Sequence, residues 1–407
     1  MSQNRLILAL AFRNLLRNLR RTVITGGAVV AGVAVMIMGW GLVDGLDENV
    51  LRAQEGTVTG QVVLRPDGWP EQGTAFPLDE AQLPSPALVA ALDADERIEA
   101  WTGRTWFQGR AVAGTEGITV RGFTYDPERD ARVFDREGWK LDGAWPAAPE
   151  EVVIGQWLAG ILQRGPGEEL VIEARTRSGA INALRLKVSG VISTGTPAAD
   201  RVVWIPLPQG ETLLGLEGAV SMIALRLPRR SLAEEVAASL GGQGWRATTV
   251  MWETRDILSI NAFRRRAIAL VVVILMLIAA TGIANTVIMA AYERVREIGT
   301  LRAMGMTPGQ IRALFLVEGA VLGSVAGLSG ALIGVVVVAW YARHGIDLSQ
   351  VANNVGDMAM ASTLYMRFSW PPVLGALGFG LGVALLASLW PAHHAASLNP
   401  ADAVRAD

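Results

Sequence analysis

A charged stretch from Tyr292 to Ile311, YERVREIGTLRAMGMTPGQI, carries the side chains best suited to chemistry, and the chemistry they suit is docking. Acidic and basic residues recur there at helical spacing, followed by Gly305 and Pro308. Side chains three or four positions apart share one face of a helix. Because the stretch lies between two long apolar runs, it predicts a short amphipathic helix along a membrane surface that docks against a soluble partner.

Few residues could support catalysis or metal binding. The chain has no cysteine, which excludes disulfides, thiolate catalysis and Cys-ligated zinc. Its only histidines are His344, His393 and His394, and the adjacent pair points to different helix faces, so no metal site is predicted. Asp126 and Asp130 could ligate a cation, although solvated loop acids are the simpler interpretation.

No nucleophile–base arrangement, paired-carboxylate motif or GxxxxGK[ST] phosphate loop occurs in the sequence. We therefore expect a non-catalytic subunit that binds no cofactor and does not hydrolyse ATP by that route unaided.

Composition indicates a membrane protein with a large water-exposed part. Of 407 residues, 51% are hydrophobic and 18% are charged, with a mean hydropathy of +0.33. This is too apolar for an ordinary soluble protein and too charged for a wholly embedded one. The net charge of −2 gives no case for nucleic-acid binding.

Four apolar runs are long enough to cross a bilayer, which needs about 20 residues. The first is a signal anchor, because its apolar part is too long for a cleavable signal peptide. The predicted fold is an α-helical membrane protein with four transmembrane helices plus a large mixed α/β extracytoplasmic head inserted between helices 1 and 2. Its segments are an amphipathic approach helix (1–22), helix 1 (23–45), the head (46–263), helix 2 (264–292), a coupling-helix loop (293–311), helix 3 (312–341), an outer loop (342–370), helix 4 (371–391) and a tail (392–407).

Basic residues before the first run place the N-terminus in the cytoplasm, and four spans return the C-terminus there. The head and the 342–370 loop then lie outside, and the 293–311 loop lies inside. The triplet Arg264–Arg266 falls on the outer side, against this pattern, and would bind lipid headgroups or pair with acids of the head.

Small residues recur within the spans. Gly319, Gly323 and Gly327 stand at every fourth position of the third span, where they would let helices approach closely, either within the chain or in a dimer. Three polar residues inside the spans are assigned structural roles in preference to a proton relay: Thr281, Asn285 and Glu318.

The head is predicted to mix strands and helices, without a motif that assigns its ligand. Ser231 and Glu234 form a capping-box pattern at the start of one helix. The predicted strands are 61–65, 118–123, 170–175, 184–192, 202–207 and 220–227, and the predicted helices are 86–93 and 231–240.

Several motifs resemble the FtsX/MacB-like permeases of ABC transporters. They cover both chain ends and all four spans, and the span–head–three-span layout is similar to that family, with a MacB-like periplasmic domain as the head. The matching residues are Arg13-Asn14-Leu15, Arg20-Arg21-Thr22, Gly282-Ile283-Ala284-Asn285-Thr286, Glu293-Arg294-x-Arg296-Glu297-Ile298-Gly299-x-x-Arg302-Ala303-x-Gly305, Glu318-Gly319 and Pro391-Ala392-x-x-Ala395-Ala396-x-x-x-Pro400-Ala401-x-Ala403-x-Arg405.

Within that family, Thr59-Gly60-Gln61-Val62-Val63-Leu64 resembles the start of the head in lipoprotein-releasing permeases of the LolC/LolE type. The resemblance implies a dimer with a second permease copy or paralogue and two copies of a separate ABC ATPase, which binds ATP and Mg. It implies mechanotransmission, in which the coupling helix docks in a groove of the ATPase. The residues assigned to this contact are Glu293, Arg296, Glu297, Gly299, Leu301, Arg302, Gly305 and Met306, with Gly299 and Gly305 allowing turns on either side.

The protein is expected in a bacterial inner membrane, in contact with membrane lipids. Its expected cargo is a lipoprotein or similarly lipidated molecule. Apolar cargo would lie between the first and second spans, with Val33, Met36, Met276 and Met289 as wall residues. Simple span packing is the alternative for each. Three other functions remain open: a MacB-like efflux permease with a periplasmic adaptor, an FtsX-like regulator of a cell-wall hydrolase, and a membrane enzyme.

Overall fold

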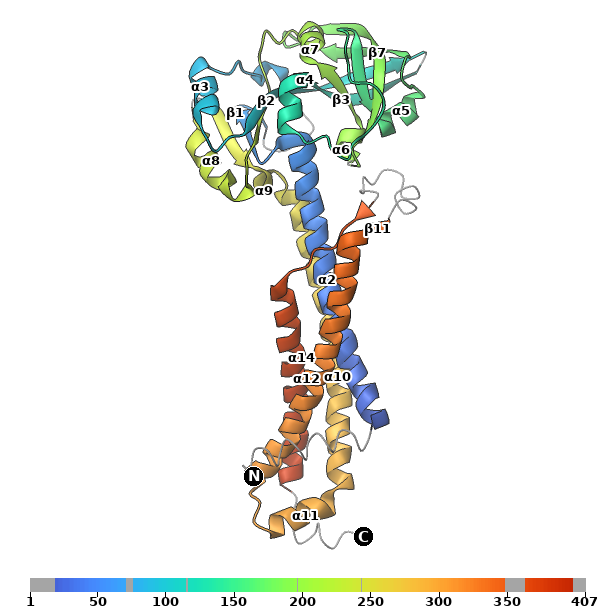
Figure 1. Cartoon of the computed structure of the whole chain (residues 1–407), viewed down its shortest axis with the longest axis vertical. Helices are drawn as coiled ribbons and strands as arrows, with labels where there is room; N and C mark the ends of the chain where they lie inside the picture. Colours follow the sequence, from blue (N-terminus) through green and yellow to red (C-terminus); the bar gives the residue numbers. More distant parts are fainter. Residues whose placement is uncertain are drawn as a thin grey trace. The chain divides into compact units, whose positions relative to one another are not determined.

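The computed structural model describes residues 19–70, 76–114, 116–195, 197–242, 244–347 and 363–397. The chain forms two compact units, a helical bundle and a head (Figure 1). The head comprises Asn49–Leu258 and Asp347–Leu364, and the remainder belongs to the bundle. Most of the predicted approach helix (1–18), most of the outer loop (348–362) and the end of the tail (398–407) lie outside the described residues.

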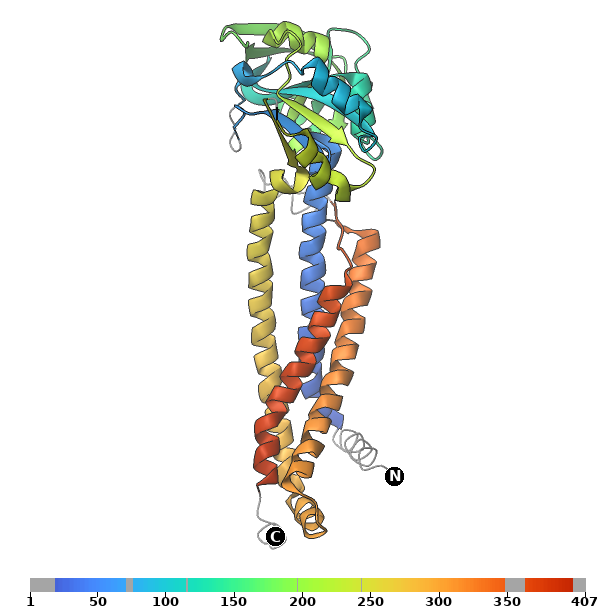
Figure 2. The ribbon, with the colours of Figure 1, turned by 90° about the vertical axis from the view of Figure 1, so that its left-hand side faces the viewer.

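Four long helices form the bundle and run side by side (Figures 1 and 2). They are α2 (Leu19–Gln54), α10 (Arg255–Glu293), α12 (Pro308–His344) and α14 (Trp370–Ala396). By length and composition, all four are able to cross a membrane. Each extends beyond its predicted apolar run, because the flanking residues continue the helix. The short helix α11 (Val295–Ala303) lies between α10 and α12, and β11 (Ile346–Asp347) pairs with β12 (Thr363–Leu364).

Glycines bring the bundle helices into close contact within this one chain. A Cβ at Gly323 would lie 2.5 Å from the Ala384 Cβ on α14, and one at Gly319 would overlap Ser388 of the same helix. Further along α12, a Cβ at Gly330 would lie 2.6 Å from the carbonyl oxygen of Val30 on α2. The glycine row of α12 therefore packs first against α14 and then against α2. Of the two predicted roles, the structure shows intrachain packing.

The Arg264–Arg266 triplet is explained in part by acids on α2. Arg265 pairs with Asp44 at 3.0 Å and also with Asp47, and its guanidinium lies 5.6 Å from the Trp40 ring centre. Arg264 donates to the side-chain oxygen of Asn261 at 2.6 Å. Arg265 therefore pairs with acids, but these acids lie on the first bundle helix and not, as had been predicted, in the head.

In the described part of the head, ten strands form one sheet, and six of them close into a ring. The ladder runs β10-β1-β9-β2-β3-β8-β5-β7-β4, and β6 pairs with both β2 and β7, which joins β2, β3, β8, β5, β7 and β6 into a barrel. The strand β2 belongs to both the open sheet and the barrel. The strands are β1 (Val62–Pro66), β2 (Ala100–Ala113), β3 (Glu116–Tyr125), β4 (Lys140–Gly143), β5 (Glu151–Gly155), β6 (Glu169–Arg175), β7 (Ile181–Ser193), β8 (Val202–Pro206), β9 (Met222–Arg226) and β10 (Trp245–Thr249).

Short helices cover the sheet, and several begin at clear capping residues. Ser85 accepts a hydrogen bond from the Leu88 amide at the start of α3, with Pro86 in the first turn. Asp126 accepts from two amides at the start of α4. The helices are α3 (Pro86–Ala94), α4 (Pro127–Val133), α5 (Gln156–Leu162), α6 (Pro197–Asp200), α7 (Leu207–Leu214), α8 (Ala233–Leu240) and α9 (Val250–Glu253), with shorter turns η1 (Glu55–Thr59), η2 (Leu78–Glu80) and η3 (Arg230–Leu232).

Alternation along β1 gives the open sheet two apolar faces. Val62 and Leu64 join the buried cluster that includes Leu88 of α3 and Val236 of α8. Val63 points the other way, into a cluster with Phe134, which follows α4. The barrel has its own buried core, which α5 and α7 complete. Two apolar layers on a sheet require cover on both sides, which the helices supply.

The six predicted strands are confirmed, but β2, β4, β5 and β10 escaped the sequence analysis. In β2 the polar residues Arg104, Thr105 and Gln108 fall on both faces, so apolar alternation is lost. The predicted capping box is wrong, because α8 follows Leu232 and has no side-chain cap. The Asp126–Asp130 cation site is wrong as well. Asp126 caps α4, while Asp130 is fully buried against Arg104, so it is not a solvated loop acid.

Candidate coupling site

The turn between α10 and α12 is a defined piece of structure. The helix α10 ends at Glu293, and after Arg294 the chain forms α11. Gly305 then adopts a positive φ of 98°, a conformation that favours glycine. Thr307 begins α12 with a reciprocal capping box to Gln310. The predicted amphipathic helix is therefore present, bounded by a tight turn and a strong cap.

The apolar side chain of Ile298 anchors α11 in the bundle. Ile298 is 4% exposed and belongs to the same buried cluster as Ala291 of α10 and Phe315 of α12. Its neighbour Gly299 is also buried, in the middle of α11. The prediction that Gly299 supplies a turn is therefore wrong, because α11 continues through it from Val295 to Ala303.

Arg294 ties the beginning of α11 to α12. Its Nε lies 2.9 Å from an oxygen of Glu297, and its Nη1 lies 3.8 Å from an oxygen of Glu318. The Arg294 and Glu318 side chains are each 13% exposed. This assigns Glu318 the structural role that its position in a span had suggested. Arg294 and Ile298 were not predicted to be anchors, although both lie inside the matching motif.

Opposite this anchored side, α11 presents a polar and exposed face. Arg296, Glu297 and Thr300 of α11 are exposed, as are Glu293 at the end of α10 and Met304 directly after α11. Met304, which sequence reasoning missed, is 72% exposed. A mixed surface from which an apolar side chain protrudes is suited to binding a protein.

The remaining predicted coupling residues lie at the end of α11 and in the turn that follows it. Arg302 and Met306 are half-buried, and Gly305 is exposed in the turn. The Leu301 side chain lies outside the described part of the structure. Contact of any of these residues with a partner stays a prediction.

The predicted cargo-facing residues divide into two groups. Val33 is fully buried, with Gly330 and Gly380 closing on it, and Met276 is 1% exposed against Gly32. These two side chains are occupied by packing inside the chain, as the simpler interpretation had it. Met36 is half-buried, whereas Met289 is 52% exposed on α10.

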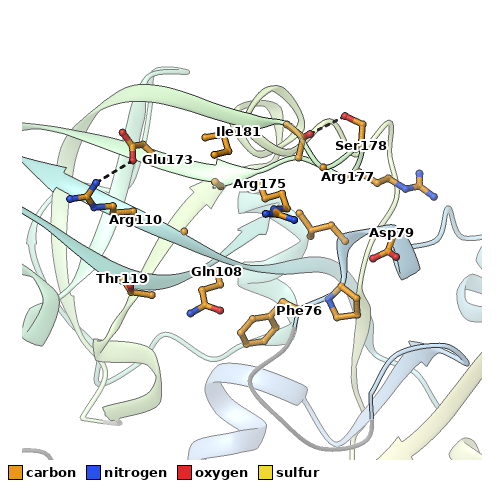
Figure 3. A pocket seen from close by; sticks show the side chains of 16 residues that line it. Phe76, Asp79, Gln108, Arg110, Thr119, Glu173, Arg175, Arg177, Ser178 and Ile181 are labelled. Carbon is orange, nitrogen blue, oxygen red and sulfur yellow. Dashed lines mark hydrogen bonds and ion pairs between the residues drawn. The ribbon is translucent and has the colours of Figure 1, made fainter.

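A cavity of about 670 Å³ opens on the barrel of the head (Figure 3). The strand register sets Gln108 of β2 beside Arg121 of β3, and Arg110 of β2 beside Glu173 of β6. Arg175 follows at the end of β6, and Arg177 lies in the turn between β6 and β7. Neither of these two side chains has an ion-pair partner among the described residues. A smaller cavity shares Gln108 with the first and adds Arg121. Together they form an arginine-lined groove, with Phe76 and Ile181 as apolar walls.

The described residues contain no group of three or more His, Asp or Glu side chains placed to hold a metal ion. His393 and His394 are exposed on α14, where the His394 ring stacks near Trp390 at 6.1 Å.

Four membrane-crossing helices, an α/β head between the first two and a charged turn between the next two define a four-span membrane protein with an inserted head. The MacB-like periplasmic core domain matches residues 22–242, and the FtsX-like permease C-terminal domain matches residues 269–400. The chain belongs to the FtsX/MacB-like family of ABC transporter permeases.

Similar proteins span several kinds of permease. An uncharacterized ABC transporter permease of Methanocaldococcus jannaschii is 22% identical over 98% of both chains. The lipoprotein-releasing system transmembrane protein LolC of Xylella fastidiosa is 25% identical over 62% of this chain and 64% of its own length. The macrolide export ATP-binding/permease protein MacB of Sodalis glossinidius is 22% identical over 95% of this chain and 58% of its own.

Among solved structures, the periplasmic region of MacB from Actinobacillus actinomycetemcomitans aligns with 51% of this chain and 97% of that chain. Its sequence identity is 14% and its TM-score is 0.33.

Proposed function

We propose that this chain is the transmembrane subunit of an ABC transporter that works by mechanotransmission with a separate ATPase subunit. The observation that carries the proposal is α11, which is anchored on one face and exposed on the other. Two ATPase copies, which bind the ATP and Mg, would bind the exposed faces in a dimer of this chain or of this chain with a paralogue. In this arrangement, α11 and both chain termini lie in the cytoplasm, and the head lies outside the inner membrane.

The anchoring of α11 gives this docking a mechanical consequence. A force on its exposed face is passed to α10 through the short connection at Arg294 and to α12 through the Arg294–Glu318 pair. Ile298 holds the helix in the buried cluster, so α11 does not move independently of the bundle. The four long helices then carry the movement toward the head. Packed side chains, ion pairs and rigid secondary-structure elements are what carry coupling between distant sites.

Release of lipoproteins or similarly lipidated cargo from the membrane is the function we favour. The similarity to LolC supports it, since that protein is named for lipoprotein release. The opening of the head at Thr59–Leu64, which resembles lipoprotein-releasing permeases, lies directly at the entry to β1. The arginine-lined groove is the surface that we assign to the partner that receives the cargo, because arginine clusters favour acidic surfaces.

Efflux with a periplasmic adaptor is the second candidate. The similarity to MacB supports it, because that match extends over 95% of this chain, more than the LolC match covers. The same coupling geometry serves both functions, so the identity of the partner decides between them.

The test is gentle affinity purification of the tagged full chain from native membranes, followed by mass spectrometry of the associated proteins. An ATPase with acylated lipoproteins supports lipoprotein release, and an ATPase with a periplasmic adaptor supports efflux. A matched variant, Met304→Asp, places a charge on the exposed face of α11 and is expected to lose the ATPase. If the wild-type chain is recovered from native membranes without any ATPase, the proposal is contradicted.

A further inference from the structure

A fully buried arginine lies at the centre of the head. Arg104 on β2 and Asp130 on α4 are both 0% exposed. The Arg104 Nε donates to one Asp130 oxygen at 2.7 Å, and Nη2 donates to the other at 2.9 Å. Two parallel hydrogen bonds of this kind fix the plane of the guanidinium as well as its position. Arg136 reaches the same carboxylate at 3.4 Å.

The third arm of this guanidinium contacts the helix that enters the head. Nη1 of Arg104 donates to the main-chain oxygen of Thr57 in η1, the π-helical turn that directly continues α2 and lies in the same compact unit as the sheet. Carbonyl groups in the last turn of a helix lack partners within the helix and carry partial negative charge. A buried cation is therefore well placed there. A positive φ of 64° at Gly60 ends the helix, after which β1 begins.

Other contacts hold the same turn and exclude water from Arg104. Arg230 pairs with Glu55 of η1. The Arg104 Cζ lies 3.7 Å from the ring centre of Phe134 and 4.3 Å from that of Phe123, which are favourable cation–π distances. Burial lowers the pKa of Arg104, and the Asp130 carboxylate opposes this effect.

A gain in folding stability does not by itself explain why a buried ion pair occupies this position. Replacing a buried ion pair with apolar side chains of similar volume is often neutral or stabilising, because the desolvation of both charges is removed. Apolar side chains, however, would leave the Thr57 carbonyl without its donor. The feature that only the charged pair provides is the link from η1 to β2.

We propose that Arg104, held in orientation by Asp130, is the positioning residue that couples the end of the α2 helix to the sheet of the head. The proposal rests on the proposed function, in which α2 carries movement to the head. The chain runs from the helix directly into β1, near one end of the ladder, and Gly60 also pairs with Leu225 of β9. Arg104 attaches it to β2, the strand shared by the open sheet and the barrel, so that displacement of η1 reaches both parts of the head.

The experiment measures the distance between the end of α2 and the barrel, in the full chain with its ATPase in lipid nanodiscs. The chain has no cysteine, so Gln54→Cys at the end of α2 and Ala180→Cys in the β6–β7 turn provide two unique spin-label sites. Their distance distribution is recorded by pulsed electron resonance, without nucleotide and with a trapped ATP state. The test variant combines Arg104→Met with Asp130→Leu, and Arg104→Lys retains the charge but not the forked geometry.

The matched control replaces an exposed pair, Arg226→Met with Glu99→Leu, which links β9 to the start of β2 at 3.2 Å. We expect the Arg104→Met/Asp130→Leu chain to keep its thermal transition, to show a broader distance distribution without nucleotide, and to lose the nucleotide-dependent shift. The control is expected to match wild type in all three. Arg104→Lys is expected to broaden the distribution as well, which provides a test even if the double variant fails to fold.

A folded double variant with the wild-type distribution and the wild-type shift would overturn the proposal. If wild type itself shows no nucleotide-dependent shift, the proposed function fails. The width of the distance distribution without nucleotide then still decides whether Arg104 fixes the end of α2 against the sheet.

Discussion

The bundle and the head both pack closely, but they use opposite residue types. In the bundle, glycines on α12 bring its backbone against α14 and α2. In the head, large aromatic rings gather around a buried ion pair, with Phe123 and Trp204 at 4.5 Å between ring centres. Lipid tails are as apolar as leucine, so helices in a membrane gain stability from close approach. In water, burial of large side chains supplies the driving force. The two regions should therefore fail under different substitutions.

The largest predicted effect is in the head. Asp130→Ala leaves the Arg104 guanidinium buried without its carboxylate, which costs about 3–5 kcal/mol for a broken buried pair. We expect a large drop in the thermal unfolding midpoint of the head, followed by tryptophan fluorescence of the full chain in detergent. Adding Arg104→Met should restore most of that loss. An unchanged midpoint for Asp130→Ala alone would show that the pair is not buried as described.

A smaller effect is predicted in the bundle. Gly323→Leu forces α12 away from Ala384 on α14, and overpacking of this kind costs about 1–3 kcal/mol. The control is Gly378→Leu on α14, where a Cβ meets nothing within 4 Å. Resistance of each variant to unfolding by SDS in mixed micelles measures the difference. Equal sensitivity of the two variants would contradict the assigned α12–α14 contact.

A pH-dependent effect distinguishes the head from the bundle. Burial raises the pKa of the Asp200 carboxyl, although Thr194 donates to it through its amide and hydroxyl. The native state then binds this proton more tightly than the unfolded chain. The stabilisation is complete below the ordinary aspartate pKa of about 3.9 and is lost as the pH rises through the native value.

Asp200→Asn should therefore make the head more stable than wild type at neutral pH and flatten the loss of stability on raising the pH from acid. Denaturant unfolding of both chains across that range provides the comparison. A steeper pH dependence in the variant would reverse the sign of the predicted effect.

The smallest predicted effect is at the head surface. Arg226 and Glu99 form an exposed pair at 3.2 Å, and such pairs are worth about 0.2–1 kcal/mol. Glu99→Gln is expected to shift the head's unfolding midpoint only slightly, and less in high salt than in low salt. A loss as large as that of Asp130→Ala would mean that burial does not set the scale of these ion pairs.

Sequence reasoning predicted the elements whose signal is local. The four spans follow from long apolar runs, and α11 follows from charged residues at helical spacing between two of them. The barrel closure could not be predicted, because the β2–β6 pairing joins strands that are far apart in the sequence. Arg104 was invisible for the same reason, since a lone arginine in a polar strand gives no sign that an aspartate and a helix end will enclose it. Ile298 was inside a recognised motif, but only the fold shows that it points into the bundle.

The most direct test of the central claim is cross-linking from the two sides of α11. In this cysteine-free chain, Met304→Cys places a thiol on the exposed face, and Ile298→Cys places one on the buried face. Each full-length variant is treated in native membranes with a short bifunctional thiol reagent, and products are identified by mass spectrometry. We predict that Met304→Cys cross-links to an ABC ATPase and that Ile298→Cys does not. Cross-linking from the buried position, or no ATPase product from Met304→Cys, would contradict the account of α11 as the ATPase-docking helix.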